Sequence, residues 1–594
     1  MDAILRVLGL PLMFENIRPL LPYMRRYRRG FAAGGFFAIC SNAIWVLFPQ
    51  VIRRAVDDMT HHLNYRGIVI YALLLLALAF SKGIFLFLTR WVLIGISRDI
   101  EYDIRNDLFR VLERQSASYF HEHRTGDIMA RATNDLNAVR MLLGPAIMYS
   151  LNTILFTLGA LFFMMRISPW LTLLAFAPLP AASILVQYFG RRIHERFERI
   201  QAMYSDISAR VQENVASVRL VRAFAQEEAE IRFFETANTE YIRRALRLVR
   251  LMGMLWPTLE FLLGLSLVVV LGVGGHEVVS HRISVGAFVA FTTYMVMLTW
   301  PVIALGWVVN LVQRGTASVR RIHEILIAQP SITDAAAASE TMPIAGDVEF
   351  RHLTFAYSDT TPTVLHDISV KIPAGTSLAI VGPTGSGKTS LVSLIPRLHD
   401  VAPGMLRIDG RPITDFPLAE LRRAVGFVPQ ETFLFSDTIR ENVAFGAPEA
   451  TEQQILEAAR AAHIRDEILE FPKGFDTLVG ERGVTLSGGQ KQRTAIARAI
   501  VRDPRILILD DALASVDTYT EERILTELAN VMRGRTTIFI SHRVSTARNA
   551  DQIAVLVEGR IVELGTHDEL VARNGYYTQL YEKQMLEEEL AVAG

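Results

Sequence analysis

The sequence contains one cysteine, Cys40, and its formal net charge at pH 7 is zero. A lone cysteine excludes an intrachain disulfide, a zinc site ligated by several cysteines and the disulfide scaffold of a small secreted domain. The 61 basic and 61 acidic residues are interspersed, without a long block of like charge. Nucleic acid is therefore not expected as a partner.

The N-terminal segment lacks the pattern of a secretory signal peptide, in which a charged start precedes an apolar core and a small-residue cleavage site. We therefore expect that nothing is cleaved. Residues 11–24 instead predict an amphipathic helix that lies on the membrane surface. The basic cluster after it predicts a cytoplasmic N-terminus, and its members are Arg25, Arg26, Arg28 and Arg29.

Long apolar runs are confined to the first part of the chain, although hydrophobic residues make up 51% of the whole. Six stretches are long enough to cross about 30 Å of hydrocarbon. They cover residues 31–54, 67–89, 141–165, 169–189, 252–274 and 285–309. We predict a multidomain chain that begins with a six-helix α-helical transmembrane domain embedded in a lipid bilayer.

Two long segments between these spans are rich in Arg, Glu, Ala and Leu, and they predict helical arms that continue the spans into the cytoplasm. The segments are residues 95–140 and 190–250. Arginine is frequent in the first of them and sparse in the short links near 166–168 and 275–284, which supports a cytoplasmic position for the arms. The residues Arg124-Thr-Gly-Asp127 predict the turn of the first arm.

A second domain follows a segment without helical or strand pattern. After it, strand-like and helical segments alternate, as in an α/β P-loop nucleotide-binding domain with a parallel sheet. The predicted boundaries are 1–325 for the transmembrane domain, 326–346 for a linker, 347–584 for the nucleotide-binding domain and 585–594 for a C-terminal tail.

The strongest motif is a phosphate-binding loop placed between a strand-like run, 377–381, and a helical segment. Its glycines let backbone N–H groups surround phosphates, Lys388 reaches the β and γ oxygens, and the Thr389 hydroxyl faces Mg²⁺. The predicted ATP-binding residues are Gly382, Pro383, Thr384, Gly385, Ser386, Gly387, Lys388, Thr389 and Ser390.

Two further motifs accompany the loop. The apolar run 506–509 predicts a buried strand that delivers Asp510 and Asp511 to its carboxyl end, where Asp510 is expected to hold Mg²⁺. The second motif begins a helix, whose free N–H groups and positive dipole end suit a γ-phosphate. It consists of Leu486, Ser487, Gly488, Gly489 and Gln490.

The Ser-Gly-Gly-Gln sequence resembles the signature of the ATP-binding cassette (ABC) family, in which each nucleotide lies between one domain's phosphate loop and the other domain's signature. The resemblance implies that Tyr357 stacks on adenine, that Gln430 senses Mg²⁺ and the attacking water, and that His542 contacts the γ-phosphate. It also implies that Asp517 lies at the dimer seam and that residues 479–483 touch the arms of the membrane domain.

The order of the domains on one chain resembles the exporter branch of that family, with the type I ABC exporter fold and bacterial multidrug-resistance-like half transporters as its nearest group. Residues 119–127 and 213–224 match the two coupling helices of the family. The resemblance implies ATP-driven export of small hydrophobic or amphipathic compounds across the cell (inner) membrane, with the nucleotide-binding domain in the cytoplasm. The alternatives are a lipid flippase and, in another class, an ATP-gated regulatory or channel protein.

Lys82 and Glu260 are charges inside the predicted spans. Each costs several kcal/mol in hydrocarbon unless it is paired or hydrated. The two could pair across a cavity or contact substrate, or both could lie in water beyond the lipid.

One residue departs from the family pattern. The residue after the Mg²⁺-binding Asp is usually Glu, which polarises the attacking water, but it is Asp511 here. An Asp carboxylate is retracted by about 1 Å, and a displacement of that size can lower a rate about 10²-fold. The departure favours a heterodimer in which this chain supplies the phosphate loop of a slow site. The alternative is a homodimer that hydrolyses ATP slowly at both sites.

Overall fold

The computed structural model describes residues 17–61, 65–334, 343–358, 361–480, 486–512, 524, 528 and 530–593. These residues form two compact units. The first unit comprises residues 1–109 and 129–327, and the second comprises 110–128 and 328–594. Residues 110–128 therefore pack with the second unit, although they follow a membrane-spanning stretch in the sequence.

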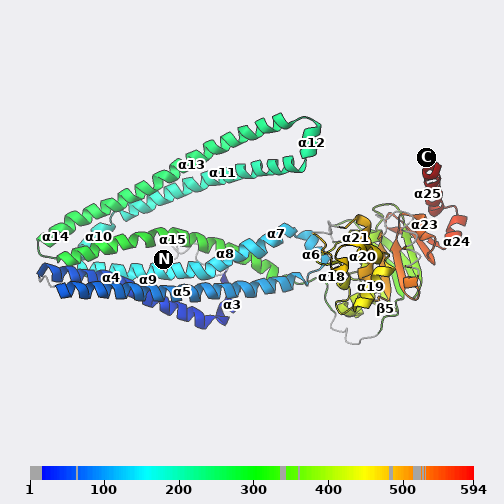
Figure 1. Cartoon of the computed structure of the whole chain (residues 1–594), viewed down its shortest axis with the longest axis horizontal. Helices are drawn as coiled ribbons and strands as arrows, with labels where there is room; N and C mark the ends of the chain where they lie inside the picture. Colours follow the sequence, from blue (N-terminus) through cyan, green and yellow to red (C-terminus); the bar gives the residue numbers. More distant parts are fainter. Residues whose placement is uncertain are drawn as a thin grey trace. The chain divides into compact units, whose positions relative to one another are not determined.

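The first unit is helical (Figure 1). Its elements are η1 Arg18–Leu20, α3 Leu21–Arg26, α4 Arg28–His61, α5 Tyr65–Leu112, η2 Arg131–Asp135, α8 Leu136–Met141, η3 Leu142–Ala146, α9 Ile147–Ile167, α10 Pro169–Phe176, α11 Leu179–Ala216, α12 Val218–Ala223, α13 Glu227–Val269, η4 Val270–Gly274, α14 Gly275–Val279 and α15 Val285–Leu326. The antiparallel pair α11 and α13, joined through α12, diverges from α4, α5, α9 and α15 in Figure 1.

Within the described residues, five helices are long and apolar enough to cross a membrane: Arg28–Thr60, Tyr65–Leu112, Thr125–Ile167, Glu227–Val279 and Val285–Leu326. The remaining predicted stretch, 169–189, is divided between α10 and the start of α11. The break lies at Ala177 and Pro178, because proline has no N–H to continue a helix and Pro178 instead caps α11.

The predicted cytoplasmic arms are helical, since α5 continues to Leu112, α11 continues to Ala216 and α13 begins at Glu227. The predicted turn at Gly126-Asp127 is wrong. Both residues lie inside α7, Thr125–Ala130, where the Asp127 carboxylate is favourable in the first turn of a helix. The chain changes direction earlier, at His123, whose backbone is extended after α6, Ala117–Glu122.

Polar contacts join α4 to α15 inside the first unit. Asp57 Oδ1 accepts a hydrogen bond from the Gly286 N–H (2.8 Å), and Asp57 Oδ2 accepts one from the Ser284 hydroxyl (2.9 Å). The carboxylate thus satisfies a free N–H of the first turn of α15, where negative charge is favourable. Further along, the Tyr294 hydroxyl donates to the Val46 carbonyl (2.6 Å), and Tyr294 is fully buried.

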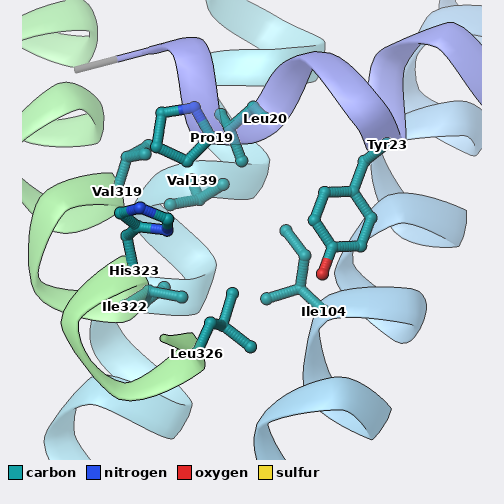
Figure 2. Close-up of a pocket in the computed structure, with 9 residues that line it drawn as sticks. All are labelled: Pro19, Leu20, Tyr23, Ile104, Val139, Val319, Ile322, His323 and Leu326. Carbon is teal, nitrogen blue, oxygen red and sulfur yellow. The ribbon is translucent and has the colours of Figure 1, made fainter. Parts of the chain in front are cut away.

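The short N-terminal helices pack across α5, α8 and α15. The Tyr23 hydroxyl donates to Asp107 (2.8 Å), while Arg26 and Tyr27 both donate to Asp103 (3.0 Å). Beneath them lies an apolar cavity of about 10 Å³, which Figure 2 shows between the ring of Tyr23 and that of His323. This volume is enough for about one water molecule, so the cavity is a packing gap.

The second unit contains two sheets. One is antiparallel and has the order β2-β1-β4-β5. Its strands are β2 Leu365–Ile372, β1 Val348–Phe355, β4 Leu406–Ile408 and β5 Arg411–Pro412. The other has the order β10-β9-β3-β8-β7-β6. Its strands are β10 Arg560–Gly565, β9 Gln552–Val557, β3 Ser377–Val381, β8 Thr536–Ile540, β7 Ile506–Asp510 and β6 Val425–Val428. The strands from β9 to β6 are parallel to one another, whereas β10 is antiparallel to β9.

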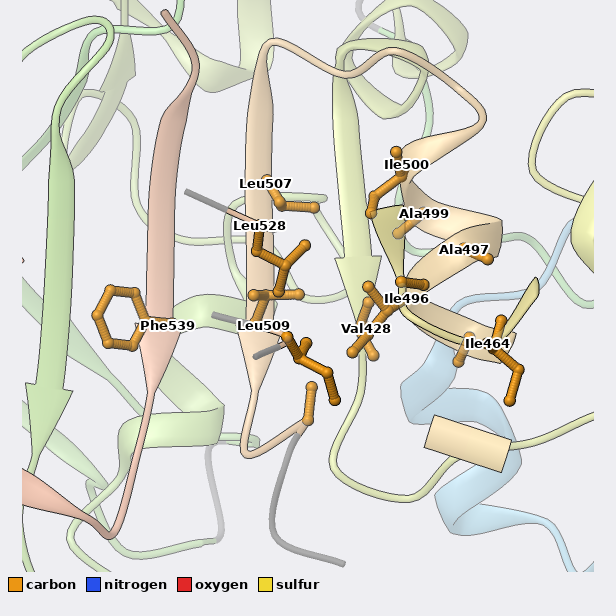
Figure 3. Close-up of a cluster of buried hydrophobic side chains, with 14 of the residues drawn as sticks. Val428, Ile464, Ile496, Ala497, Ala499, Ile500, Leu507, Leu509, Leu528 and Phe539 are labelled. Atoms are coloured by element: carbon orange, nitrogen blue, oxygen red, sulfur yellow. The ribbon is translucent and has the colours of Figure 1, made fainter. Parts of the chain in front are cut away.

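The helices of the second unit include α16 Lys388–Ser393, α17 Leu418–Ala424, α18 Ile439–Ala444, α19 Glu452–Ala461, α20 Arg465–Glu470, α21 Gly488–Ile500, α23 Val544–Ala547, α24 His567–Ala572 and α25 Tyr576–Ala593. Side chains of α21, such as Ile496 and Ile500, pack against those of β6 and β7, such as Val428 and Leu509 (Figure 3). The central strands β7 and β8 are buried along their whole length and are mostly apolar, as is typical of parallel strands covered by helices.

The contact between α4 and α15 leads to a stability prediction. A Cβ atom added at Gly286 would lie 2.1 Å from the Arg53 carbonyl and 2.6 Å from the Asp57 carboxyl group. Gly286→Ala must therefore push α15 away from α4, at a cost of about 1–3 kcal/mol. We expect a lower Tm in thermal unfolding of the detergent-purified chain.

The matched control is Gly306→Ala on the same helix, where an added Cβ meets nothing within 4 Å. Alanine favours a helix over glycine by up to about 1 kcal/mol, so this variant should keep or raise the Tm. Equal Tm values for the two variants would contradict the proposed importance of the α4–α15 contact.

Candidate nucleotide-binding site

Four neighbouring parallel strands deliver the candidate residues to one edge of the sheet. The phosphate loop follows β3, His542 follows β8, and Gln430 follows β6. Asp510 ends β7, and Asp511 comes directly after it. Parallel strands place their carboxyl ends at the same edge, where ligands bind in open α/β sheets. These residues line one cavity of about 180 Å³, together with Val364, Thr384, Gly385, Gly387, Lys388, Thr389, Ser390 and Ile540.

The phosphate loop has the backbone that its glycines permit. Gly382, Gly385 and Gly387 have φ values of 149°, 82° and 98°, a region that side chains disfavour. An added Cβ at Gly382 would lie 2.0 Å from the Leu556 carbonyl, so this glycine is also required by close backbone approach. Ser386 is buried, and its hydroxyl has no hydrogen-bond partner within the described residues.

Lys388 begins α16 with its side chain folded back into the loop. The ammonium group donates to the carbonyl oxygens of Gly382 and Pro383, at 2.9 Å each. Burial lowers the pKa of Lys388, and the nearby carboxylates of Asp511 and Asp510 oppose that shift. The loop therefore holds a buried cation that an anionic ligand would stabilise.

Thr389, in the first turn of α16, contacts Asp510 at the end of β7. The Thr389 hydroxyl donates to Asp510 Oδ1 (3.1 Å), while Asp510 Oδ2 is buried without a hydrogen-bond partner in the described part of the chain. Burial raises the pKa of Asp510, to which the charge of Asp511 adds, whereas Thr389, Lys388 and His542 act in the opposite direction. An oxygen left in this state suits a hard cation that a nucleotide brings with it.

Asp511 adjoins His542 at the cavity wall. Its carboxylate Oδ2 lies 3.9 Å from His542 Nε2. The backbone of Asp511 has a φ of 49°, in the left-handed region that Asp enters more readily than most residues. The two side chains therefore form an acid and imidazole pair beside Lys388.

Tyr357 is held next to this cavity without lining it. Its hydroxyl shares a hydrogen bond with Ser390 Oγ (2.7 Å), and its ring packs edge-on against Phe355 and His399. The ring remains 44% exposed, which leaves a free aromatic surface beside the phosphate loop. Such a surface can stack on a base.

The predicted signature lies at the start of α21 and does not line the cavity. Ser487 Oγ accepts the Gln490 N–H (3.2 Å), and Gln490 Oε1 accepts the Ser487 N–H (3.0 Å), which forms a capping box. Gln490 and Arg493 also bind the Glu467 carboxylate of α20. These contacts hold the start of α21 in place. Its N-terminus can bind an anion, but that anion would lie outside the chain's own cavity.

Sequence reasoning missed Val364 and Ile540 as cavity-lining residues, because no motif includes them. Ile540 ends β8 just before His542, so the strand order could have indicated it. Asp517 and residues 481–483 lie outside the described residues.

Lys82 and Glu260, the two charges predicted inside the membrane, lie on α5 and α13. Lys82 Nζ lies 3.3 Å from the ring centroid of Trp45 on α4, a cation–π contact. Glu260 lies on α13 and is exposed. Their pairing across a cavity and their contact with substrate stay predictions.

Comparison with known proteins follows the division into two units. Residues 31–302 match the ABC transporter transmembrane region, and residues 365–514 match the ABC transporter family that binds ATP. The chain is 36% identical to the multidrug resistance-like ATP-binding protein MdlA of Escherichia coli (strain K12), over 95% of this chain and 96% of that protein. It is 37% identical to the ATP-dependent lipid A-core flippase of Syntrophus aciditrophicus (strain SB), over 97% of this chain and 96% of that protein.

Among solved structures, a bacterial Atm1-family ABC exporter with ATP bound matches with a TM-score of 0.77 and 28% identity, over 94% of this chain and 98% of that one. The predicted exporter fold is thus confirmed, with a helical transmembrane region followed by a nucleotide-binding domain. The chain belongs to the ABC transporter family as a half transporter of the exporter type, an ATPase coupled to transport across a membrane.

Proposed function

We propose that this half transporter uses ATP and Mg²⁺ to export small hydrophobic or amphipathic compounds across the cell (inner) membrane, with its N-terminus and second unit in the cytoplasm. The observation that carries the proposal is the cavity that joins Lys388, Thr389 and Asp510 on a chain with long apolar helices. The multidrug resistance-like relative supports this cargo class.

The residues of the cavity have distinct roles in this proposal. Lys388 and the loop N–H groups bind the β- and γ-phosphates, and Tyr357 stacks on adenine. His542 contacts the γ-phosphate, and Asp511 acts on the attacking water. Gln430 senses the water and the metal from the end of β6.

Thr389, Asp510 and Gln430 would hold Mg²⁺. Within the described residues there is no group of three or more His, Cys, Asp or Glu side chains that could hold a metal. The pairing of one carboxylate, Asp510, with the Thr389 hydroxyl fits Mg²⁺, which binds through one or two carboxylates together with substrate phosphates. The buried and unpaired Asp510 Oδ2 supports this assignment. When bound, the metal neutralises charge on the phosphate oxygens.

The same geometry supports a partner subunit, since no signature residue lines the chain's own cavity. We propose that it closes on the nucleotide of a second half transporter. The tip of the α11–α12–α13 hairpin supports a partner as well, because it exposes large apolar side chains on an arm predicted to leave the membrane. They are Val215, Val218, Leu220 and Phe224.

Lipid flipping is the second candidate, because a lipid A-core flippase is among the relatives. Inside-out vesicles would distinguish the two cargoes. Uptake of a fluorescent hydrophobic cation against its gradient supports drug export, and translocation of a labelled lipid without added drug supports the flippase. Vanadate-insensitive movement down a gradient would contradict both and favour a channel.

Lys388→Ala tests the ATP site. It removes the phosphate-binding cation but no apolar packing, so we expect loss of transport and at least about a 10²-fold lower ATPase rate, with normal membrane insertion. Lys371→Ala, at a surface lysine that pairs only loosely with Asp347 at 3.6 Å, should keep both activities. Full transport by Lys388→Ala would refute the assignment.

Asp511→Glu tests the slow-site hypothesis. The longer side chain brings the carboxylate nearer to the attacking water, so the ATPase rate of the purified chain should rise at least about tenfold. The double variant Lys388→Ala/Asp511→Glu should be inactive, which would show that the gain comes from this cavity. Vigorous ATPase activity and transport by the unmodified chain alone would contradict both the slow site and the need for a different partner.

Phe120→Ala tests coupling through α6. Phe120 is 43% exposed, and its ring meets that of Tyr119 edge-on with the ring centroids 5.6 Å apart. The helix belongs to the nucleotide-binding unit. Coupling by rigid-body motion requires a firm contact between the helix and the nucleotide-binding unit, and the substitution removes the ring that would make it. Transport should therefore fall about five- to tenfold, while ATPase activity stays within about twofold. Glu122→Ala is the control on the same helix. A parallel fall of both activities with protein abundance would indicate a purely structural residue.

A further inference from the structure

The C-terminal helix α25 reaches the main chain that carries His542. Gln584 Nε2 donates a hydrogen bond to the His542 carbonyl (2.6 Å), and Gln584 Oε1 accepts one from the Val544 N–H (2.7 Å). One amide side chain therefore binds the backbone on both sides of Arg543. No sequence motif includes Gln584, which lies 42 residues after His542.

The helix that bears Gln584 is firmly anchored at its start. The Glu563 carboxylate of β10 accepts the N–H groups of Tyr576 (2.6 Å) and Tyr577 (3.0 Å), and so caps the helix N-terminus. Tyr577 is fully buried, and its hydroxyl shares a hydrogen bond with His567 Nδ1 (2.8 Å). Gln584 follows Tyr577 by seven residues, two helical turns, and so lies on the same helix face.

The segment around His542 is a short turn that is joined to β3, where the Ile380 carbonyl accepts the Ser541 N–H (3.4 Å). β8 ends at Ile540 and α23 begins at Val544, so the residues between them belong to neither element. Inside this turn, Ser541 Oγ accepts the Arg543 N–H (3.0 Å) and donates to the Arg543 carbonyl (3.1 Å). Those bonds are local, whereas Gln584 ties the turn to a separate helix.

We propose that Gln584 is a positioning residue for ATP hydrolysis, which holds the His542 main chain so that the imidazole faces the γ-phosphate beside Asp511. The inference rests on the role proposed above for His542. A turn that loses both amide bonds can shift by a fraction of an ångström, and misplacement of about 1 Å can lower a rate about 10²-fold. Phosphate binding by Lys388 and the loop does not involve Gln584, so ATP affinity should be unchanged.

The test uses Gln584→Met in the full chain, because Met keeps the length and packing of Gln but cannot hydrogen-bond through an amide. Single-turnover hydrolysis, with protein in excess over radiolabelled ATP, measures even a slow site. We expect a five- to tenfold lower rate, with the dissociation constant for ATP and the Tm unchanged. The matched control is Gln579→Met, at an exposed glutamine on the same helix, which should match the unmodified chain.

A double-mutant cycle with His542→Ala separates positioning from a general structural effect. If Gln584 acts through His542, then His542→Ala/Gln584→Met should be no slower than His542→Ala alone. Additive losses, a rate for Gln584→Met equal to that of the unmodified chain, or a fall in Tm and ATP affinity that accounts for the loss would each overturn the inference. An absence of hydrolysis in the unmodified chain would instead contradict the proposed function.

Discussion

The nucleotide-binding unit depends on two opposite charges, Lys388 and Asp510, buried at the carboxyl edge of one parallel sheet. The protein supplies each with only part of the partners that its charge requires. Lys388 has two carbonyl oxygens, and Asp510 has the hydroxyl of Thr389 on one of its two carboxylate oxygens. In the proposed function, a nucleotide with its metal would complete both sets, since phosphate oxygens would satisfy the ammonium and the metal would satisfy the carboxylate. The binding energy of ATP thus comes from charges already ordered and desolvated before it arrives.

The membrane unit is organised by a different constraint, because hydrocarbon cannot hydrogen-bond backbone groups. Its spans are therefore helices, and their ends are satisfied by side chains such as Asp57 at the start of α15 and Ser168 at the start of α10. Several of these helices are much longer than a membrane span, as α5 (Tyr65–Leu112) and α13 (Glu227–Val269) are. A long continuous helix transmits rotation and translation with little loss, which suits a machine whose ATP sites and transport pathway are far apart in the sequence.

Much of this organisation could be predicted from the sequence because local patterns encode it. The strand, loop and helix at 377–393 follow from a run of apolar residues, glycines and Lys388, and the structure reproduces them. The turn at Gly126-Asp127 was mispredicted because both residues are also tolerated in the first turn of a helix. The break at Pro178 was missed because hydropathy alone does not register the missing N–H. Gln584 was out of reach, since only tertiary folding brings α25 beside His542.

The site residues also separate two steps that ATP performs. In the proposed function, Lys388 binds the phosphates while Thr389 and Asp510 hold Mg²⁺, and none of the three is altered by the departure at Asp511. A site of this kind can bind ATP and close on a partner's signature, since closure requires only differential contact with the nucleotide. Reopening requires the γ-phosphate bond to break, and that step depends on Asp511 and on a correctly held His542. A chain with strong binding and weak hydrolysis would therefore remain closed longer at this site than at a partner site with Glu. In the proposed heterodimer, a difference of one methylene group would thereby decide which of the two sites sets the timing of the cycle.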